Sequence, residues 1–322
     1  MQIVTADIGG THARFALATI EQGRVTHLGE PVTLKCAEYA SLQTAWEAFG
    51  QTIGEPLPRA AAIALATPIR GEVLKMTNNP WVIRPALVRE KLNVDDYILI
   101  NDFGAVAHAV QHCGADHYSH LCGPGGDLPE KGVITVIGPG TGLGVAYVVR
   151  SPDGYRAVET EGGHVDYSPL DSIEDAILAR LRRQHRRVSV ERVCSGPGLA
   201  AIYETLASIE GRAVVSMEDK ALWQLALSGE DSLAAAAFDR FCLSLGAAAG
   251  DFALAQGAGA VVIAGGLGQR IADRLPQSGF EERFVAKGRF QQLMETIPVK
   301  LIDHPQPGLF GAAAAFAQEN AA

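Results

Sequence analysis

Short apolar runs alternate with glycine turns and amphipathic stretches along the first third of the chain. Residues 2–7 and 14–20 are apolar and β-rich and flank a Gly-Gly pair, so they predict a hairpin. Residues 60–67 and 97–101 are continuous apolar runs, typical of strands buried on both faces. Between the strands, helical spacing predicts two helices: 39–49 and 85–91. Strands that alternate with helices predict an α/β fold.

The same pattern begins again at Gly132. Residues 133–137 and 145–150 predict two strands around the sequence GPGTGLG, and 260–264 predicts a buried strand. Further helices are predicted over five stretches: 172–184, 198–208, 216–228, 232–256 and 309–318. The two strand–glycine–strand units stand a domain's length apart, which indicates two related halves.

Two stretches are less regular. Residues 111–131 show no clear period and predict a domain boundary or a surface excursion. Residues 252–269 carry no charge over the shortest length that spans a membrane, about 18 residues. Because glycines interrupt them, we interpret them as a helix end, the strand 260–264 and a glycine turn rather than a membrane span.

Composition narrows the function classes. The 322 residues suffice for about two domains, and 48% hydrophobic with 20% charged residues is ordinary for a globular protein. The formal net charge of −9 argues against a binder of nucleic acid or anionic membranes, because both attract positive charge. Thirty-five glycines predict many tight turns or close backbone approaches to a ligand.

Cysteine usage and the first residues bear on the compartment. The five cysteines contain no CxxC pair, which favours a reducing compartment. The first residues lack the basic and apolar regions of a signal peptide. We therefore expect a cytoplasmic protein.

The first glycine segment, DIGGT at 7–11, carries a carboxylate. A predicted buried strand delivers Asp7 at its end, and Gly9 and Gly10 allow backbone N–H groups to approach an anion such as phosphate. Thr11 adds a hydroxyl. Asp7 suits Mg²⁺ held through water, because Mg²⁺ keeps most of its hydration. The alternative is a plain hairpin turn with no ligand.

The second glycine segment, GPGTGLG at 138–144, differs from a dinucleotide fingerprint. Leu143 stands where the third glycine belongs, and the segment leads into a strand instead of a helix. No Gly-Lys pair of a Walker A loop occurs in the chain. We interpret the segment as a second phosphate-binding hairpin, with four candidate residues: Gly138, Gly140, Thr141 and Gly142.

Asn101 and Asp102 follow the predicted strand 97–101. Ligands of α/β proteins bind at such strand ends, and an aspartate there can take a proton from a hydroxyl nucleophile. The alternative is that Asp102 caps a helix that starts near Gly104.

Gly265 and Gly266 follow the predicted strand 260–264. A flat base or a ribose can press against the backbone of such a pair. The alternative is close packing between a helix and a strand.

Two more segments supply polar groups. EGGHVD presents Glu161 and His164 from one tight turn, which suits a polyhydroxyl ligand. A metal site that includes Asp166 is the alternative, although no HExxH-type helix is present. Glu191, in ERVCSGPG, is either a pocket residue or a surface acid.

Two clusters suggest other functions. The arginine-rich stretch 180–192 is more typical of a solvated helix face than of nucleic-acid binding, given the net charge of the chain. The His and Cys residues between 112 and 122 match no zinc-finger or ribbon spacing. We interpret them as a mobile loop rather than a zinc site.

In combination, these segments resemble the bacterial glucokinase family, within the superfamily of sugar kinases and actin-like ATPases. The likeness covers nearly the whole chain through eight motifs in order: DIGGTHAR, ATPIRGEVLKMTNNPW, INDF, GPGTGLGVA, EGGHVDYSP, ERVCSGPGL, VVIAGGLG and PGLFGAAA. Each motif is weak alone, but their order and spacing make the combination specific.

The resemblance implies ATP-dependent phosphorylation of D-glucose at its 6-hydroxyl, with Asp102 as the general base. It implies five sugar-binding residues: Asn101, Asp102, Glu161, His164 and Glu191. It implies ATP and Mg²⁺ as cofactors, with phosphates held at eight positions: Asp7, Gly9, Gly10, Thr11, Gly138, Gly140, Thr141 and Gly142. Gly265 and Gly266 would pack against the adenosine.

The resemblance also implies a two-lobed actin-like ATPase (ribonuclease H-like) fold, each lobe a mixed sheet flanked by helices. Residues 1–110 plus 301–322 form the small lobe and 111–300 the large lobe, and the two close over the sugar. The expected assembly is a homodimer that binds glucose and ATP but neither nucleic acid nor membrane.

Three alternatives remain at this point. A sugar-binding regulator without catalysis has no need of Asp102 and two phosphate loops. An actin-like ATPase has no purpose for the polar set that includes Glu161 and Glu191. A broader hexokinase, which also accepts mannose or fructose, is the alternative among the kinases.

Overall fold

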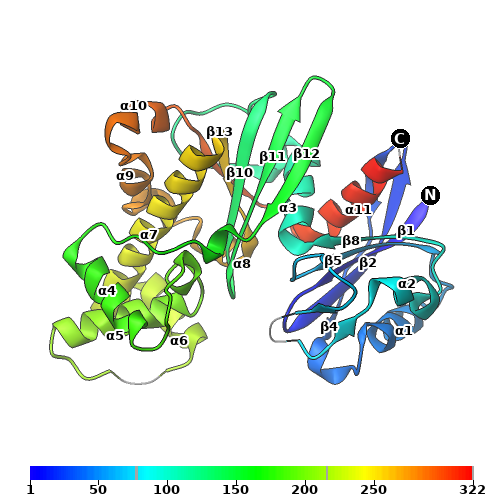
Figure 1. The fold of residues 1–322 in the computed structure, drawn as a ribbon, viewed down its shortest axis with the longest axis horizontal. Helices are drawn as coiled ribbons and strands as arrows, with labels where there is room; N and C mark the ends of the chain where they lie inside the picture. The colour runs from blue at the N-terminus through cyan, green and yellow to red at the C-terminus, as the bar shows by residue number, and fades with distance from the viewer. Residues whose placement is uncertain (77–78, 215–216, 321–322) are drawn as a thin grey trace. The chain divides into compact units, whose positions relative to one another are not determined.

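The computed structural model describes residues 1–76, 79–214 and 217–320. The chain divides into two compact units, each with its own sheet (Figure 1). Unit 1 comprises Met1–Gly114, Ala157–Glu159 and His304–Ala322, and unit 2 comprises Ala115–Arg156 and Thr160–Asp303.

A six-stranded sheet forms the centre of unit 1. Its strands are β1 (Gln2–Ile8), β2 (His12–Glu21), β3 (Arg24–Leu28), β4 (Val32–Lys35), β5 (Ala60–Leu65) and β8 (Asp96–Asn101). β1 pairs antiparallel with β2 and parallel with β5, which in turn runs parallel to β8. The register places Ile8, Leu65 and Asn101 in one row, so β1, β5 and β8 end at the same edge. A small hairpin pairs β6 (Leu74–Lys75) with β7 (Val82–Ile83).

Helices cover both faces of the unit 1 sheet. One face packs on α1 (Leu42–Ile53) and α2 (Pro85–Leu92). The short 3₁₀ turn η1 (Cys36–Glu38) precedes α1 in the chain. The other face packs on α11 (Pro307–Glu319), which lies against α3 (Asp102–His112) (Figure 1). Gly311 permits this close contact, because a Cβ there would lie 1.7 Å from the carbonyl oxygen of Ala105.

Five strands of the unit 2 sheet repeat this topology, and the sixth, β9, pairs with β14 instead. Its strands are β9 (Tyr118–Cys122), β10 (Gly132–Pro139), β11 (Leu143–Ser151), β12 (Gly154–Thr160), β13 (Ala258–Ile263) and β14 (Val299–Ile302). β10 pairs antiparallel with β11 and parallel with β13, and β14 runs parallel to β13. The structure thus confirms the repeated strand–turn–strand unit. We call residues 9–11 the first glycine turn and residues 140–142 the second glycine turn.

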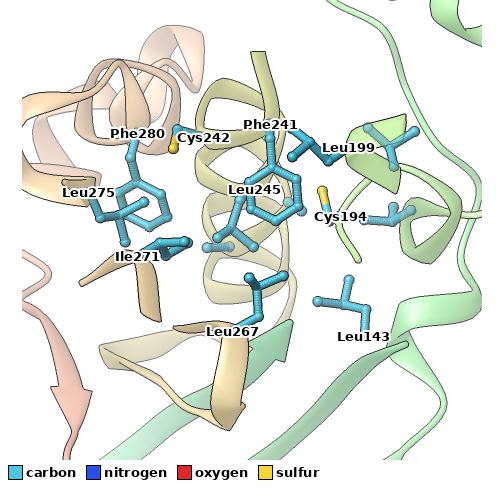
Figure 2. Close-up of a cluster of buried hydrophobic side chains, with 14 of the residues drawn as sticks. Leu143, Cys194, Leu199, Phe241, Cys242, Leu245, Leu267, Ile271, Leu275 and Phe280 are labelled. Atoms are coloured by element: carbon cyan, nitrogen blue, oxygen red, sulfur yellow. The ribbon is translucent and has the colours of Figure 1, made fainter. Parts of the chain in front are cut away.

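Seven α-helices are described in unit 2, several of them packed around one long helix. They are α4 (Ser172–Arg182), α5 (Gly198–Ile209), α6 (Asp219–Ser228), α7 (Ser232–Gln256), α8 (Gly265–Ile271), α9 (Phe280–Val285) and α10 (Gln291–Met294). The structure also describes five 3₁₀ turns in this unit: η2 (Ala115–His117), η3 (Gly162–His164), η4 (Val190–Arg192), η5 (Leu275–Gln277) and η6 (Gly288–Phe290). Figure 2 shows the buried cluster along α7, where Phe241 and Leu245 lie between Leu267 of α8 and Leu199 of α5.

The uncharged stretch 252–269 consists of the end of α7, the strand β13 and the start of α8, as predicted. Among the described helices, α7 is long and apolar enough to cross a membrane, but 72% of its most apolar window is buried inside the protein. It is therefore the core helix of unit 2.

The structure corrects three other predictions. Residues 111–131 hold the division between the units, after Gly114, but they also contain β9, an edge strand paired with β14 that was not predicted. Gly138 lies inside β10 opposite Gly144, so the second turn is shorter than the sequence GPGTGLG. The helix predicted over 216–228 begins at Asp219, and Ser216 lies outside the described residues. The α/β class, with a mixed sheet and helices in each half, is confirmed.

Candidate functional site

The first glycine turn follows Asp7, which lies near the end of β1 and opposite Arg14 of β2. The nearest atoms, Asp7 Oδ2 and Arg14 Nη1, are 3.5 Å apart. Burial raises the pKa of Asp7, and Arg14 offsets part of that rise. Gly308 at the start of α11 packs on the same carboxylate, since a Cβ there would lie 2.9 Å from Oδ2. Neither Arg14 nor Gly308 was predicted as part of this site.

Within the first turn, the N–H of Gly9 donates to the carbonyl oxygen of His12 at 2.9 Å. That hydrogen bond closes the hairpin. Gly10 and the exposed Thr11 form the tip between the two strands. The turn thus presents a hydroxyl and backbone near a buried carboxylate, a donor and acceptor set that suits a phosphate with its metal ion.

Asn101 and Asp102 join β8 to α3 at the same sheet edge. Asn101, not Asp102, is the N-cap: its Oδ1 accepts from the N–H groups of Phe103 (2.9 Å) and Gly104 (3.1 Å). The helix begins at Asp102, whose Oδ1 accepts from the N–H of Phe103 at 2.9 Å. Because β5 alone separates β1 from β8, the strand ends that carry Asp7 and Asp102 stand about 10 Å apart, given about 4.8 Å between neighbouring strands.

The second glycine turn lies at the equivalent edge in unit 2. The N–H of Gly140 donates to the carbonyl oxygen of Gly142 at 2.8 Å, and Thr141 is exposed at the tip. The N–H of Leu143 donates to Glu191 Oε2 at 3.0 Å. The structure therefore brings Glu191 to the predicted phosphate loop, although it lies 48 positions from Leu143 along the chain. No feature of the sequence predicted this contact.

Gly265 and Gly266 have different surroundings. Gly265 has a φ of +81°, and its Cβ would lie 2.9 Å from the carbonyl oxygen of Pro139, so it packs against the second turn. Gly265 begins α8, and Gly266 is its second residue, where a Cβ would meet nothing within 4 Å. The packing interpretation is correct for Gly265, whereas Gly266 has the open face that a nucleoside needs.

Glu161 and His164 project from η3 into solvent. Their side chains are 56% and 58% exposed, and His164 Nε2 lies 3.9 Å from Glu161 Oε2. The backbone below them is tightly packed, because a Cβ on Gly163 would lie 2.1 Å from the carbonyl oxygen of Leu143. The rigid turn thus holds two accessible polar groups beside the start of β11.

A pocket of about 240 Å³ lies in unit 2 next to the second turn. Thr141 and Glu191 line it together with residues of α4, α5 and the intervening segment: Arg180, Leu181, Gln184, His185, Arg192, Ser195, Pro197, Ala200, Ala201 and Glu204. Arg180 pairs with Glu204 across it. Of the predicted phosphate and sugar residues of unit 2, Thr141 and Glu191 therefore share one hollow with arginine side chains.

The arginine-rich stretch 180–192 and the His/Cys residues between 112 and 122 have different surroundings in the structure. Part of the arginine-rich stretch forms ion pairs, Arg180 with Glu204 and Arg187 with Asp166, so the stretch is more than a solvated face. The His/Cys stretch contains β9, where Cys122 is buried and His120 is exposed. Within the part of the chain that the structure describes, no three His, Cys, Asp or Glu side chains are grouped for a metal ion.

The chain is similar to known proteins over nearly its whole length. The family model described as Glucokinase matches residues 4–319. A glucokinase from Zymomonas mobilis subsp. mobilis is 63% identical over 319 residues, which cover 99% of this chain and 98% of that protein.

The chain belongs to the glucokinase family.

Solved structures extend the glucokinase likeness to the fold. A glucokinase from an Antarctic psychrotroph is 34% identical with a TM-score of 0.84, covering 98% of this chain and 99% of that chain. A ROK family glucokinase from Streptomyces griseus in complex with glucose and AMPPNP is 20% identical, with a TM-score of 0.65 and coverage of 99% and 100%. The actin-like fold is confirmed, and the chain is an ATP-dependent hexose kinase that phosphorylates glucose.

Proposed function

We propose that Asp102 is the general base that takes the proton from the 6-hydroxyl of D-glucose while that oxygen attacks the γ-phosphorus of ATP. The observation that carries this assignment is its position. Asp102 is the first residue of α3, directly after β8, at the sheet edge that also holds the first glycine turn. Phosphoryl transfer needs mainly positioning and charge stabilisation, so an aspartate with a fixed backbone is sufficient as base.

Sugar binding is assigned to residues of both units. Asn101 and Asp102 belong to unit 1, and Glu161, His164 and Glu191 to unit 2. Each carries an amide, imidazole or carboxylate that can exchange hydrogen bonds with hydroxyl groups. The Streptomyces griseus relative, solved with glucose and AMPPNP, supports a polyhydroxyl and a nucleotide as joint ligands of this fold.

The nucleotide is assigned to the two glycine turns and to the pair Gly265 and Gly266. Asp7 fits Mg²⁺, since a carboxylate oxygen is a ligand that Mg²⁺ prefers and Arg14 stands 3.5 Å away, a length beyond a good hydrogen bond. When bound, Mg²⁺ neutralises charge on the phosphates. The chain's own contribution is to hold that carboxylate on β1, beside α11, and to present backbone at both turns.

Assembly and compartment are further parts of the proposal. The family resemblance supports a homodimer, which sedimentation analysis tests. Four of the five free cysteines are buried, which is compatible with the reducing cytoplasm. Glucose 6-phosphate formation there would feed glycolysis.

The deciding experiment is turnover of Mg²⁺-ATP with and without glucose, followed through glucose 6-phosphate, with Asp102→Asn measured alongside. Loss of the base should lower kcat by about 10²–10⁴-fold, while calorimetry still detects glucose binding. Wild-type turnover in Asp102→Asn would remove Asp102 from the base role.

The same assay separates the alternatives. Glucose binding without product would favour a regulator, and ATP turnover indifferent to glucose would favour an ATPase. Mannose and fructose as acceptors test the breadth of the sugar site, and ADP and polyphosphate test the phosphoryl donor.

A further inference from the structure

The carboxylate of Glu191 is held by the backbone of the second glycine turn. The N–H of Leu143, the first residue of β11, donates to Glu191 Oε2 at 3.0 Å. A hydrogen bond from an amide to a carboxylate is shorter and stronger than a neutral one. One carboxylate oxygen of Glu191 is therefore already engaged by the loop assigned to the phosphates.

The space beside that oxygen exists because residue 142 is glycine. A Cβ on Gly142 would lie 2.5 Å from Glu191 Oε2 and 3.2 Å from its Cδ. Gly140, two positions earlier in the same turn, has room, since a Cβ there would meet nothing within 4 Å. A side chain at position 142 would therefore displace the Glu191 carboxylate, whereas one at position 140 would not.

The turn and the Glu191 segment are also joined elsewhere. The N–H of Gly196 donates to the carbonyl oxygen of Gly140 at 2.7 Å. The side chains of Leu143 and Cys194 are buried in the same cluster beneath the turn (Figure 2). Neither segment can shift without the other, because close-packed side chains move together.

We propose that Gly142 and the N–H of Leu143 are positioning groups for sugar binding: they fix Glu191 Oε2 and leave Oε1 to accept a hydroxyl of glucose. This inference rests on the proposed role of Glu191 in the sugar site. It also predicts coupling, because a phosphate that moves the second glycine turn moves Glu191 with it. The sugar and nucleotide parts of unit 2 then act through one shared hydrogen bond.

The test is calorimetric titration of the full-length enzyme with glucose, in the absence of any nucleotide. Gly142→Ala forces the flexible carboxylate away from Leu143 and should weaken glucose binding at least about tenfold, as expected for a lost hydrogen bond to a charged group. Gly125→Ala is the control and should leave the glucose Kd within about twofold, since Gly125 lies outside both glycine turns and a Cβ there meets nothing within 4 Å.

A double substitution separates positioning from phosphate binding. In a Glu191→Ala background, Gly142→Ala should change the glucose Kd by less than about twofold, because the group it displaces is gone. If Gly142→Ala raises only the KM for ATP and leaves the glucose Kd unchanged, or if its effect adds in full to Glu191→Ala, the proposal is overturned.

The hydrogen bond between the Leu143 N–H and Glu191 can also be tested without sugar. Amide exchange at Leu143, followed by NMR, should accelerate in Gly142→Ala and Glu191→Ala and stay slow in Gly125→Ala. If the wild-type enzyme binds no glucose, the proposed function fails even where this exchange pattern is seen. Unchanged exchange in Gly142→Ala would instead show that the contact is not made and would overturn the inference alone.

Discussion

The two glycine turns occupy equivalent places in sheets that share the topology of five strands, yet they obtain their carboxylates in different ways. In unit 1 the carboxylate belongs to the strand itself, as Asp7 of β1, and the start of α11 packs on it through Gly308. In unit 2 the carboxylate of Glu191 arrives from a separate segment and is held by the N–H of Leu143.

This difference separates what the strand–turn–strand repeat specifies in the site from what the packing of other elements supplies. The strand–turn–strand repeat specifies a backbone shape and therefore two places where amide groups approach an anion. The acidic groups depend on which other element packs on each turn. In unit 1 that element lies at the other end of the chain, and in unit 2 it lies between two helices.

The candidate site residues of the two units also differ in how much they contribute to the stability of the fold. Asn101 caps α3 with two hydrogen bonds and is buried. Glu161 makes no cap bond to η3, and more than half of its side chain is exposed. Substitution of Asn101 should therefore lower the stability of the fold, whereas substitution of Glu161 should leave it nearly unchanged.

The largest effect on stability is expected from Gly311→Ala. Its Cβ would lie 1.7 Å from the carbonyl oxygen of Ala105, so α11 must move off α3 and take Gly308 away from Asp7. Overpacking of this kind costs about 3 kcal/mol of unfolding free energy, measured by urea unfolding. The control is Gly125→Ala, where a Cβ meets nothing within 4 Å. Equal stability of the two variants would refute the tight α3–α11 contact.

A smaller effect is expected at Asn101. Asn101→Ala should lose about 1 kcal/mol of stability through the missing cap, whereas Asn101→Asp should retain the cap. A rise in the glucose KM of Asn101→Asp would then report sugar binding rather than folding. Glu161→Ala should raise the glucose KM without a change in Tm. If Glu161→Ala destabilises the enzyme as much as Asn101→Ala, the contrast between the units is wrong.

The smallest effect, opposite in sign, is expected at Asp7. Burial raises its pKa in the folded state above the ordinary value of 3.8, despite Arg14. Its contribution to stability is therefore fully present below pH 3.8 and is lost as the pH rises through the folded pKa. Asp7→Asn should melt higher than the wild type at pH 7, while it loses activity.

The pH series checks that sign. The difference in Tm between Asp7→Asn and the wild type should shrink as the pH falls toward 3.8 and below, because both residues are then uncharged. A variant that melts lower at pH 7 would show instead that the pairing with Arg14 outweighs the cost of burial.

Local signals predicted much of this protein. Continuous apolar runs predicted β5, β8, β10 and β13, because only buried strands in a covered sheet take that pattern. Helical spacing predicted α7 at its observed bounds. The order of eight motifs predicted the family, since short segments of a shared site must recur in the same order along the chain.

What failed depended on partners distant in the sequence. β9 was missed because an edge strand of mixed polarity forms only when β14 offers it a free edge. The alternative in which Asp102 caps α3 is wrong, since Asn101 holds that position, and helix ends are uncertain by one or two residues from sequence alone.

The sequence by itself determined the fold class, the glucokinase family and the segments that carry its chemistry, because spacing and residue type are local properties. Only the tertiary structure decided that Gly308 packs on Asp7, that Gly265 packs against Pro139 and that Gly142 leaves room for Glu191. The physical reason is that a close approach depends on which backbone lies opposite a glycine, and chain folding alone brings those backbones together.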